Sequence, residues 1–197
     1  MKTIKTFLFA GVLSASTLVT LPALAADYVI DTEGSHAFVQ FRVKHLGYSW
    51  LYGRFNDFSG EFTYDKKNPE KNSISITLET DSVDTNHAER DKHIRSDDFL
   101  NVEKYPEAKF VSTGYKPTGD HKAQVTGNLT LHGVTKPITV DVVHVGGGKD
   151  PWGGYRDGFE GSVTIKPEEF GIPMAKKLGP ASAEVEMTLS FEGIRQK

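Results

Sequence analysis

The segment AEVEMTLSF, residues 183–191, decides how this chain is expected to fold, because apolar and polar side chains alternate along it without interruption. Odd-numbered positions from Ala183 to Phe191 are apolar, whereas even-numbered positions from Glu184 to Ser190 are charged or hydroxylated. Successive side chains of a β-strand point to opposite faces of a sheet. A period of two therefore predicts a strand that buries one face.

Similar alternation recurs along most of the chain and predicts a fold built almost entirely from strands. Together these segments make about eight strands, and short strands at regular spacing are typical of sandwiches and barrels. Closure into a barrel removes exposed strand edges, so we expect an all-β fold, an eight-stranded barrel. Besides 183–191, and after a short extended lead-in at 28–31, the predicted strands are 36–45, 55–64, 73–80, 109–115, 123–131, 138–145 and 155–165.

Three connections between these strands are expected to be irregular. The aromatic segment GYSWLYG, residues 47–53, and the glycine-rich segment GGGKDPWGG, residues 146–154, are interpreted as loops. A longer connection at 166–180 has room for one helical turn at 168–170. Glycine and proline mark such turns because they adopt backbone angles that other residues avoid.

One long segment, Ser82–Pro106, interrupts the strand pattern. We expect a helix at Ala88–Arg95, with Asn86 as its N-cap and Glu89 completing a capping box. The apolar stripe of this helix is narrow, so caps and docking contacts must hold it. The sequence therefore predicts a short helical insertion at about 84–100 that lies at one end of the barrel and governs access to it.

The N-terminus has the features of a secretory signal peptide. Lys2 and Lys5 precede an uncharged, mostly apolar run at 7–21, and Ala-Leu-Ala at 23–25 is a small-x-small cleavage site. A membrane-spanning helix is the weaker alternative, because the run is short and rich in Ser and Thr. We expect residues 1–25 to be removed, and residues 26–197 to form a single domain in the periplasm.

Composition narrows the function classes. The net charge is −3 before the two leader lysines are removed. Nucleic-acid binders are usually basic, so we expect no nucleic-acid partner. The chain has no cysteine, so its core must hold the fold without disulfides.

The sequence lacks the common catalytic and metal-binding motifs. His87 and His93 are six residues apart, which does not match a helical zinc site, and His36 and His45 lie at opposite ends of one predicted strand. There is no G-x-S-x-G elbow, phosphate-binding loop or dinucleotide fingerprint. We expect no enzyme activity, metal or cofactor. A metal built from residues distant in sequence stays open, so the alternative is a metal-dependent enzyme or metal-binding protein that uses the His-rich insertion.

Phenylalanines recur on the strand faces that are expected to point inward. They fill a solid core in the simplest interpretation, and in the sharper one they enclose a hollow that takes a long hydrocarbon chain. Inward glycines at 60, 127 and 161 favour the hollow or merely allow the strands to bend. Each buried CH₂ group contributes ~0.8 kcal/mol, so a long tail would bind tightly. The predicted lining residues are Val39, Phe41, Val43, Phe55, Phe58, Phe62, Phe110, Leu129, Phe159, Val185, Met187 and Leu189.

A second group of residues is expected at the mouth of this tunnel. Two tryptophans in the predicted loops would cover the opening or pack on its rim. The basic residues of the insertion would meet a polar or anionic head group, or form a solvated helix face. The predicted mouth residues are His45, Trp50, Arg90, His93, Arg95 and Trp152.

Five motifs give the chain a family resemblance. They are HAFVQFRVKHLG (36–47), VDTNHAERDKHIRSDDFL (83–100), Tyr105-Pro106, LTLHGVTKPITV (129–140) and DPWGG (150–154). With them the chain resembles the YceI family of secreted bacterial proteins, from about residue 27 to the end.

The resemblance implies an extended antiparallel, lipocalin-like barrel. It also implies binding of a polyisoprenoid lipid, such as an isoprenoid quinone or a polyprenyl phosphate, or of another long-chain amphiphile. The expected function is that of a periplasmic binding or carrier protein with an isoprenoid lipid as its partner. Transient contact with a membrane surface and dimer formation both fit this expectation, and the oligomeric state stays open.

Overall fold

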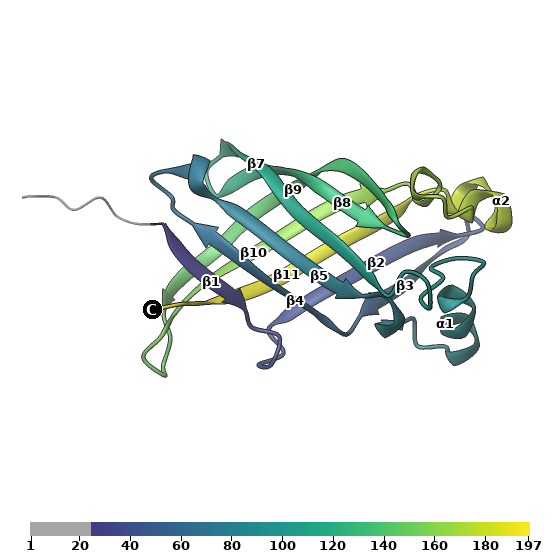
Figure 1. The fold of residues 1–197 in the computed structure, drawn as a ribbon, viewed down its shortest axis with the longest axis horizontal. Coiled ribbons are helices and arrows are strands. Elements are labelled where there is room, and N and C mark those ends of the chain that lie inside the picture. Colours follow the sequence, from purple (N-terminus) through teal and green to yellow (C-terminus); the bar gives the residue numbers. More distant parts are fainter. Residues whose placement is uncertain (1–24) are drawn as a thin grey trace, which may run out of the picture.

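A computed structural model describes residues 25–197, which form an elongated barrel with two short α-helices at one end (Figure 1). The predicted signal peptide, residues 1–25, lies outside the described residues apart from Ala25. No helix in the described part has the length and apolar composition needed to cross a membrane. The strands are β1 (Ala26–Ile30), β2 (Ala37–His45), β3 (Ser49–Phe55), β4 (Phe58–Tyr64), β5 (Ser73–Glu79), β6 (Val83–Asp84), β7 (Glu107–Gly119), β8 (Lys122–Leu131), β9 (Val134–Lys149), β10 (Tyr155–Ile165) and β11 (Val185–Arg195).

The eleven strand segments form eight strands of the barrel, because three pairs of segments run end to end. β1 and β2 both pair antiparallel with β11, through Ile30 with Gly193 and Ala37 with Phe191. On the next strand, β4 pairs with β1 and β3 pairs with β2. On the strand after that, β5 pairs with β4 and β6 pairs with β3. The pairing of β1 with β11 closes the ring. The predicted eight-stranded antiparallel barrel is therefore confirmed.

Two glycines on the inner surface are required by neighbouring aromatic rings. The Phe41 ring on β2 covers Gly53 on β3, and the Phe110 ring on β7 covers Gly127 on β8; a Cβ at either glycine would collide with the ring. Gly127 therefore makes room for a neighbouring side chain and not for a ligand. Gly161, in contrast, does line the internal cavity described below.

Part of the interior, next to β1, is filled by a buried aromatic cluster. Tyr28 and Phe62 stack with ring centroids 4.7 Å apart, and Phe159 meets Phe62 edge-on at 5.4 Å. The Tyr28 hydroxyl donates a 2.6 Å hydrogen bond to the buried Asp157 carboxylate, and His144 Nε2 lies 2.8 Å from the other oxygen. Burial and the hydrogen bond to Asp157 raise the pKa of Tyr28, so its hydroxyl remains a donor.

The insertion forms helix α1 (Ala88–Arg95), with the predicted bounds, at one end of the barrel (Figure 1). Its cap differs from the expectation. Asn86 adopts a left-handed conformation with φ of 59°, and His87 is the N-cap, whose Nδ1 accepts the Arg90 N–H at 3.2 Å. The Asp91 carboxylate accepts both the N–H and the hydroxyl of Thr85. These local bonds replace a broad apolar face as the means of fixing the helix.

Two segments expected as loops are largely strand. Residues 49–53 belong to β3, because every residue of β3 pairs with a residue of β2. Residues 146–149 extend β9. Turns remain at Gly47–Tyr48 and in the stretch after Lys149, where the Asp150 carboxylate accepts the N–H groups of Trp152 and Gly154. Position 147 in this strand requires glycine, because a Cβ there would collide with the Asp157 carboxylate.

The connection between β10 and β11 carries more helix than the sequence predicts. The expected turn is present as a 3₁₀ helix at Pro167–Phe170. Helix α2 (Met174–Leu178) follows and was not predicted, because its five residues are too few to show a periodic pattern. Three further 3₁₀ turns are Pro69–Lys71, Thr80–Ser82 and Pro180–Ser182.

Candidate ligand cavity

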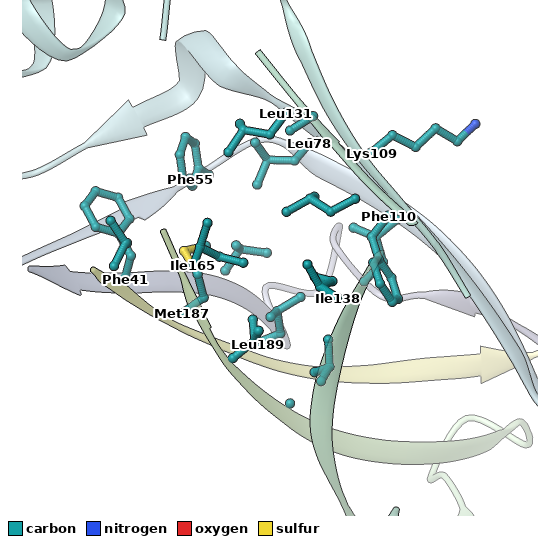
Figure 2. A pocket seen from close by; sticks show the side chains of 18 of the residues that line it. Phe41, Phe55, Leu78, Lys109, Phe110, Leu131, Ile138, Ile165, Met187 and Leu189 are labelled. Atoms are coloured by element: carbon teal, nitrogen blue, oxygen red, sulfur yellow. The ribbon is translucent and has the colours of Figure 1, made fainter. Parts of the chain in front are cut away.

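An internal cavity of about 620 Å³ runs through the barrel and under both helices. Its volume falls within the range of about 300–1,000 Å³ that is typical of small-molecule sites. Figure 2 shows aliphatic and aromatic side chains from several strands converging on this space, among them Phe41, Met187 and Leu189. Lys109 also borders the cavity, but its ammonium group points away from these side chains (Figure 2).

The structure brings nearly all of the predicted lining residues together. Phe58 is the exception: it packs between the two buried clusters of the core and is not part of the cavity wall. The predicted residues that do border the cavity are Val39, Phe41, Val43, Phe55, Phe62, Phe110, Leu129, Phe159, Val185, Met187 and Leu189.

Other lining residues were missed by sequence reasoning, for two different reasons. Those on strands obey the same alternation and could have been included on that signal. Those on the insertion and on α2 have no periodic signal, and only the folded chain places them over the barrel. The missed strand residues include Ile74, Ile76, Leu78, Leu131, Ile138, Val140, Val142 and Ile165, and those near the helices include Ile94, Phe99, Leu100, Ile172, Met174 and Leu178.

Three of the predicted mouth residues, His45, Arg90 and His93, border the cavity. Arg90 is already engaged, since its Nε and Nη2 donate to the hydroxyl and carbonyl of Thr85, each at 2.7 Å. The His93 ring packs edge-on against Phe99, with ring centroids 4.8 Å apart.

The other three mouth residues do not border the cavity. Arg95 donates to the carbonyls of Asp81 and Val83 at 2.6 and 2.7 Å, so it anchors the insertion. Trp50 lies on β3 beneath the Arg42 guanidinium, 4.2 Å from the ring centroid. Trp152 is 76% exposed in the turn between β9 and β10, which lies at the end opposite α1 (Figure 1). Sequence alone does not say which barrel end a turn reaches, and the structure separates the turn that carries Trp152 from the helical insertion.

A link between the two helical segments lies at the helical end of the barrel. Lys177 of α2 forms an ion pair with Asp98, which follows α1, and His93 Nε2 lies 3.4 Å from the other Asp98 oxygen. Hydrogen bonds from Lys177 and, to a smaller extent, from His93 lower the pKa of Asp98. α1 and α2 both contribute residues to the cavity wall, so this ion pair ties together the two segments that cover it.

The His-rich insertion does not gather metal ligands. Among residues 25–197, one group of side chains has metal-ligand character, Asp31, His36 and Glu192, whose ligand atoms lie within 4.8 Å of one another. None of them belongs to the insertion. The Arg156 Nη1 lies between the acidic pair, 2.5 Å from Asp31 and 3.1 Å from Glu192. A guanidinium in that position already balances the two carboxylates, so the group is an ion-pair network.

A closed eight-stranded antiparallel barrel that encloses an apolar cavity defines a lipocalin-like protein. The sequence profile of the YceI-like domain matches residues 28–193. A protein of Pseudomonas aeruginosa (strain LESB58) named UPF0312 protein is 61% identical over 193 residues, which cover 98% of this chain and 100% of the relative. The chain therefore belongs to the YceI family.

Solved structures share the fold. Burkholderia cenocepacia BcnA superposes with a TM-score of 0.74 at 24% identity, over 83% of this chain and 98% of BcnA. A polyisoprenoid binding domain from Saccharophagus degradans, described as implicated in plant cell wall breakdown, superposes with a TM-score of 0.60 at 16% identity. That match covers 86% of this chain and 98% of the domain. At these identities the likeness concerns the fold.

Proposed function

We propose that this protein is a periplasmic carrier that sequesters a polyisoprenoid lipid, or a similar long-chain amphiphile, inside its barrel without covalent chemistry. The observation that carries the proposal is the cavity of about 620 Å³ enclosed by apolar side chains of strands and helices. The binding domain from Saccharophagus degradans, whose name states a polyisoprenoid ligand, supports the same ligand class. The N-terminal sequence features support export to the periplasm.

The energetics favour a long tail over a small apolar ligand. Burial of one CH₂ group contributes ~0.8 kcal/mol, while association costs roughly 4–15 kcal/mol in lost freedom of motion. A tail of about ten carbons therefore only offsets that cost, and each further isoprene unit adds net affinity. An elongated cavity inside strands of up to 16 residues suits such a ligand.

Extraction of the purified protein tests the proposal. The full-length gene is expressed, and the protein is isolated from the periplasmic fraction, extracted with organic solvent and analysed by mass spectrometry. A prenyl lipid near one equivalent per chain, and an N-terminus at Ala26, support the proposal. Protein that stays in the cytoplasm contradicts the location, and protein with stoichiometric zinc and no lipid favours the metal-dependent alternative.

The alternative built on the insertion gains nothing from the structure. His87 accepts the Arg90 N–H as a helix cap, and His93 faces Asp98 and Phe99. The two histidines are thus used in local contacts of the insertion. The relatives also suggest a binding protein and not an enzyme.

A further inference from the structure

Polar side chains interrupt the apolar wall of the cavity at the end away from the helices. Tyr64 at the end of β4, Asn72 just before β5, and Tyr115 on β7 all border the cavity. The pairing of Thr63 with Ser73 brings Tyr64 and Asn72 side by side. Figure 1 shows the connection between β4 and β5 at the end of the barrel opposite α1. Tyr64, Asn72 and Tyr115 are called the distal polar group below.

The Asn72 amide has a fixed orientation and a free donor. Its Oδ1 accepts the Asp65 N–H at 2.7 Å, which leaves the Nδ2 pointing elsewhere. Asn72 is only 8% exposed, and its Nδ2 has no hydrogen-bond partner among the described residues. A buried donor without an acceptor is unfavourable, and native proteins rarely leave one. Because Asn72 borders the cavity, a ligand that enters the cavity can supply this acceptor.

The two tyrosines add hydroxyl donors beside this amide. Burial raises the pKa of Tyr115, and it raises the pKa of Tyr64 to about 12, so both hydroxyls carry a proton at neutral pH. The Asn72 amide lies close enough to the Tyr115 hydroxyl to oppose part of this effect on the pKa of Tyr115, although no hydrogen bond of ordinary geometry joins the two side chains. The Tyr64 ring packs against both Phe159 and His144, with centroid distances of 5.0 and 5.1 Å.

The field around the distal polar group disfavours an anion. The carboxylates of Asp157 and Asp65 both help to raise the pKa of Tyr64, so their negative charge reaches this site. The basic residues that border the cavity are elsewhere: Arg90 lies on α1, and the Lys109 ammonium points away from the cavity (Figure 2). Lys71, next to Asn72 in the chain, helps to lower the pKa of Asp65 but does not border the cavity. Donors with no cationic side chain beside them in the cavity wall suit a neutral acceptor.

We propose that the distal polar group binds a neutral oxygen acceptor of the ligand, such as a carbonyl, ester or ether oxygen, and discriminates against phosphate. This inference rests on the carrier function and deepens it. It places the polar part of the ligand at the end of the cavity away from the helices, with the prenyl tail extending toward α1 and α2. A quinone-type carbonyl meets this requirement, whereas a polyprenyl phosphate does not.

A competition assay with matched ligands tests the proposal. The delipidated protein is loaded with the fluorophore N-phenyl-1-naphthylamine, which is then displaced by geranylgeranyl acetate, geranylgeranyl phosphate or the saturated hydrocarbon of the same chain length. One or two hydrogen bonds of ordinary strength predict that the acetate binds about tenfold tighter than the hydrocarbon. The acetate is also expected to bind tighter than the phosphate.

Two sets of variants localise the preference. Tyr64→Phe combined with Tyr115→Phe removes both hydroxyls with little change of volume. Asn72→Asp, assayed at pH 8, keeps an oxygen for the Asp65 N–H but removes the Nδ2 donor. Both are expected to reduce the acetate-to-hydrocarbon preference, the ratio of the two affinities measured on the same variant, to about twofold or less. Tyr155→Phe, on β10 and outside the cavity wall, is the matched control and should keep the wild-type preference.

The outcomes separate this site from the carrier function. Equal wild-type affinities for acetate and hydrocarbon, a preference that survives in the double variant, or tighter binding of the phosphate would each overturn the distal site and leave the carrier proposal standing. Failure of all three ligands to displace the fluorophore would overturn both. Thermal unfolding of each variant confirms that the protein compared is folded.

Discussion

The ion pair between Asp31 and Arg156 gives a stability prediction whose size follows from the structure. Asp31 is 6% exposed at the end of β1, and its carboxylate accepts from Arg156 Nη1 and from the Gly34 N–H at 2.9 Å. The hydrogen bond from Arg156 is the main reason that the pKa of Asp31 falls from 3.8 to about 2. Because one pKa unit corresponds to about 1.4 kcal/mol, the lowered pKa amounts to about 2 kcal/mol of folding free energy.

The sign of the pH dependence is fixed by the direction of that shift. The pKa is lower in the folded than in the unfolded chain, so the contribution is complete above the unfolded value near 3.8 and is lost as the pH falls toward about 2. Asp31→Asn is therefore expected to lower the free energy of unfolding by about 2 kcal/mol at pH 7. The difference from wild type should shrink steadily between pH 4 and pH 2.

Urea denaturation followed by circular dichroism, at a series of pH values from 7 to 2.5, measures this difference. Asp120→Asn is the control, since the Asp120 side chain is 89% exposed, and it should change stability by less than about 0.5 kcal/mol. A wild-type-to-variant difference that stays constant from pH 7 to pH 2.5 would refute the reasoning, as would one no larger than the control at pH 7.

Three further predictions concern the cavity and its surroundings. Val185→Asp puts a charge into the apolar wall and should abolish lipid retention or folding. Glu186→Gln, on the outer face of the same strand, is the control and should keep the lipid. Retained lipid with full stability in Val185→Asp would mean that the strand faces are inverted. Arg95→Ala should lower the free energy of unfolding by about 1–2 kcal/mol in urea titrations, because the insertion loses two carbonyl contacts, and no loss would show that the anchor is dispensable. Trp152→Ala should leave the affinity for a prenyl ligand unchanged within about twofold in the displacement assay, because Trp152 is 76% exposed and does not border the cavity; a tenfold loss would place it at the site after all.

The alternation of apolar and polar residues determines much of the fold. Alternation from Val185 to Leu189 predicted a strand and its inner face. The same pattern predicted Phe41 and Phe110 as wall residues, and both border the cavity. Such a pattern is readable because side-chain direction in a strand depends only on local geometry. Closure was also predictable, since eight strands with one apolar face each have few other ways to cover their edges.

Other features needed the tertiary structure. Phe58 has the sequence pattern of a wall residue, but it packs between two clusters. The turn that carries Trp152 lies at the end of the barrel opposite α1. The role of Asn72 depends on a neighbour that fixes its amide and on a cavity that leaves its donor free. Each of these depends on strand register and on contacts between distant segments, whereas the sequence by itself specifies only the local period of two. The alternation in the sequence therefore determined which strand faces are apolar. Only closure of the barrel decided where those apolar faces pack against one another and where they stay apart around a cavity.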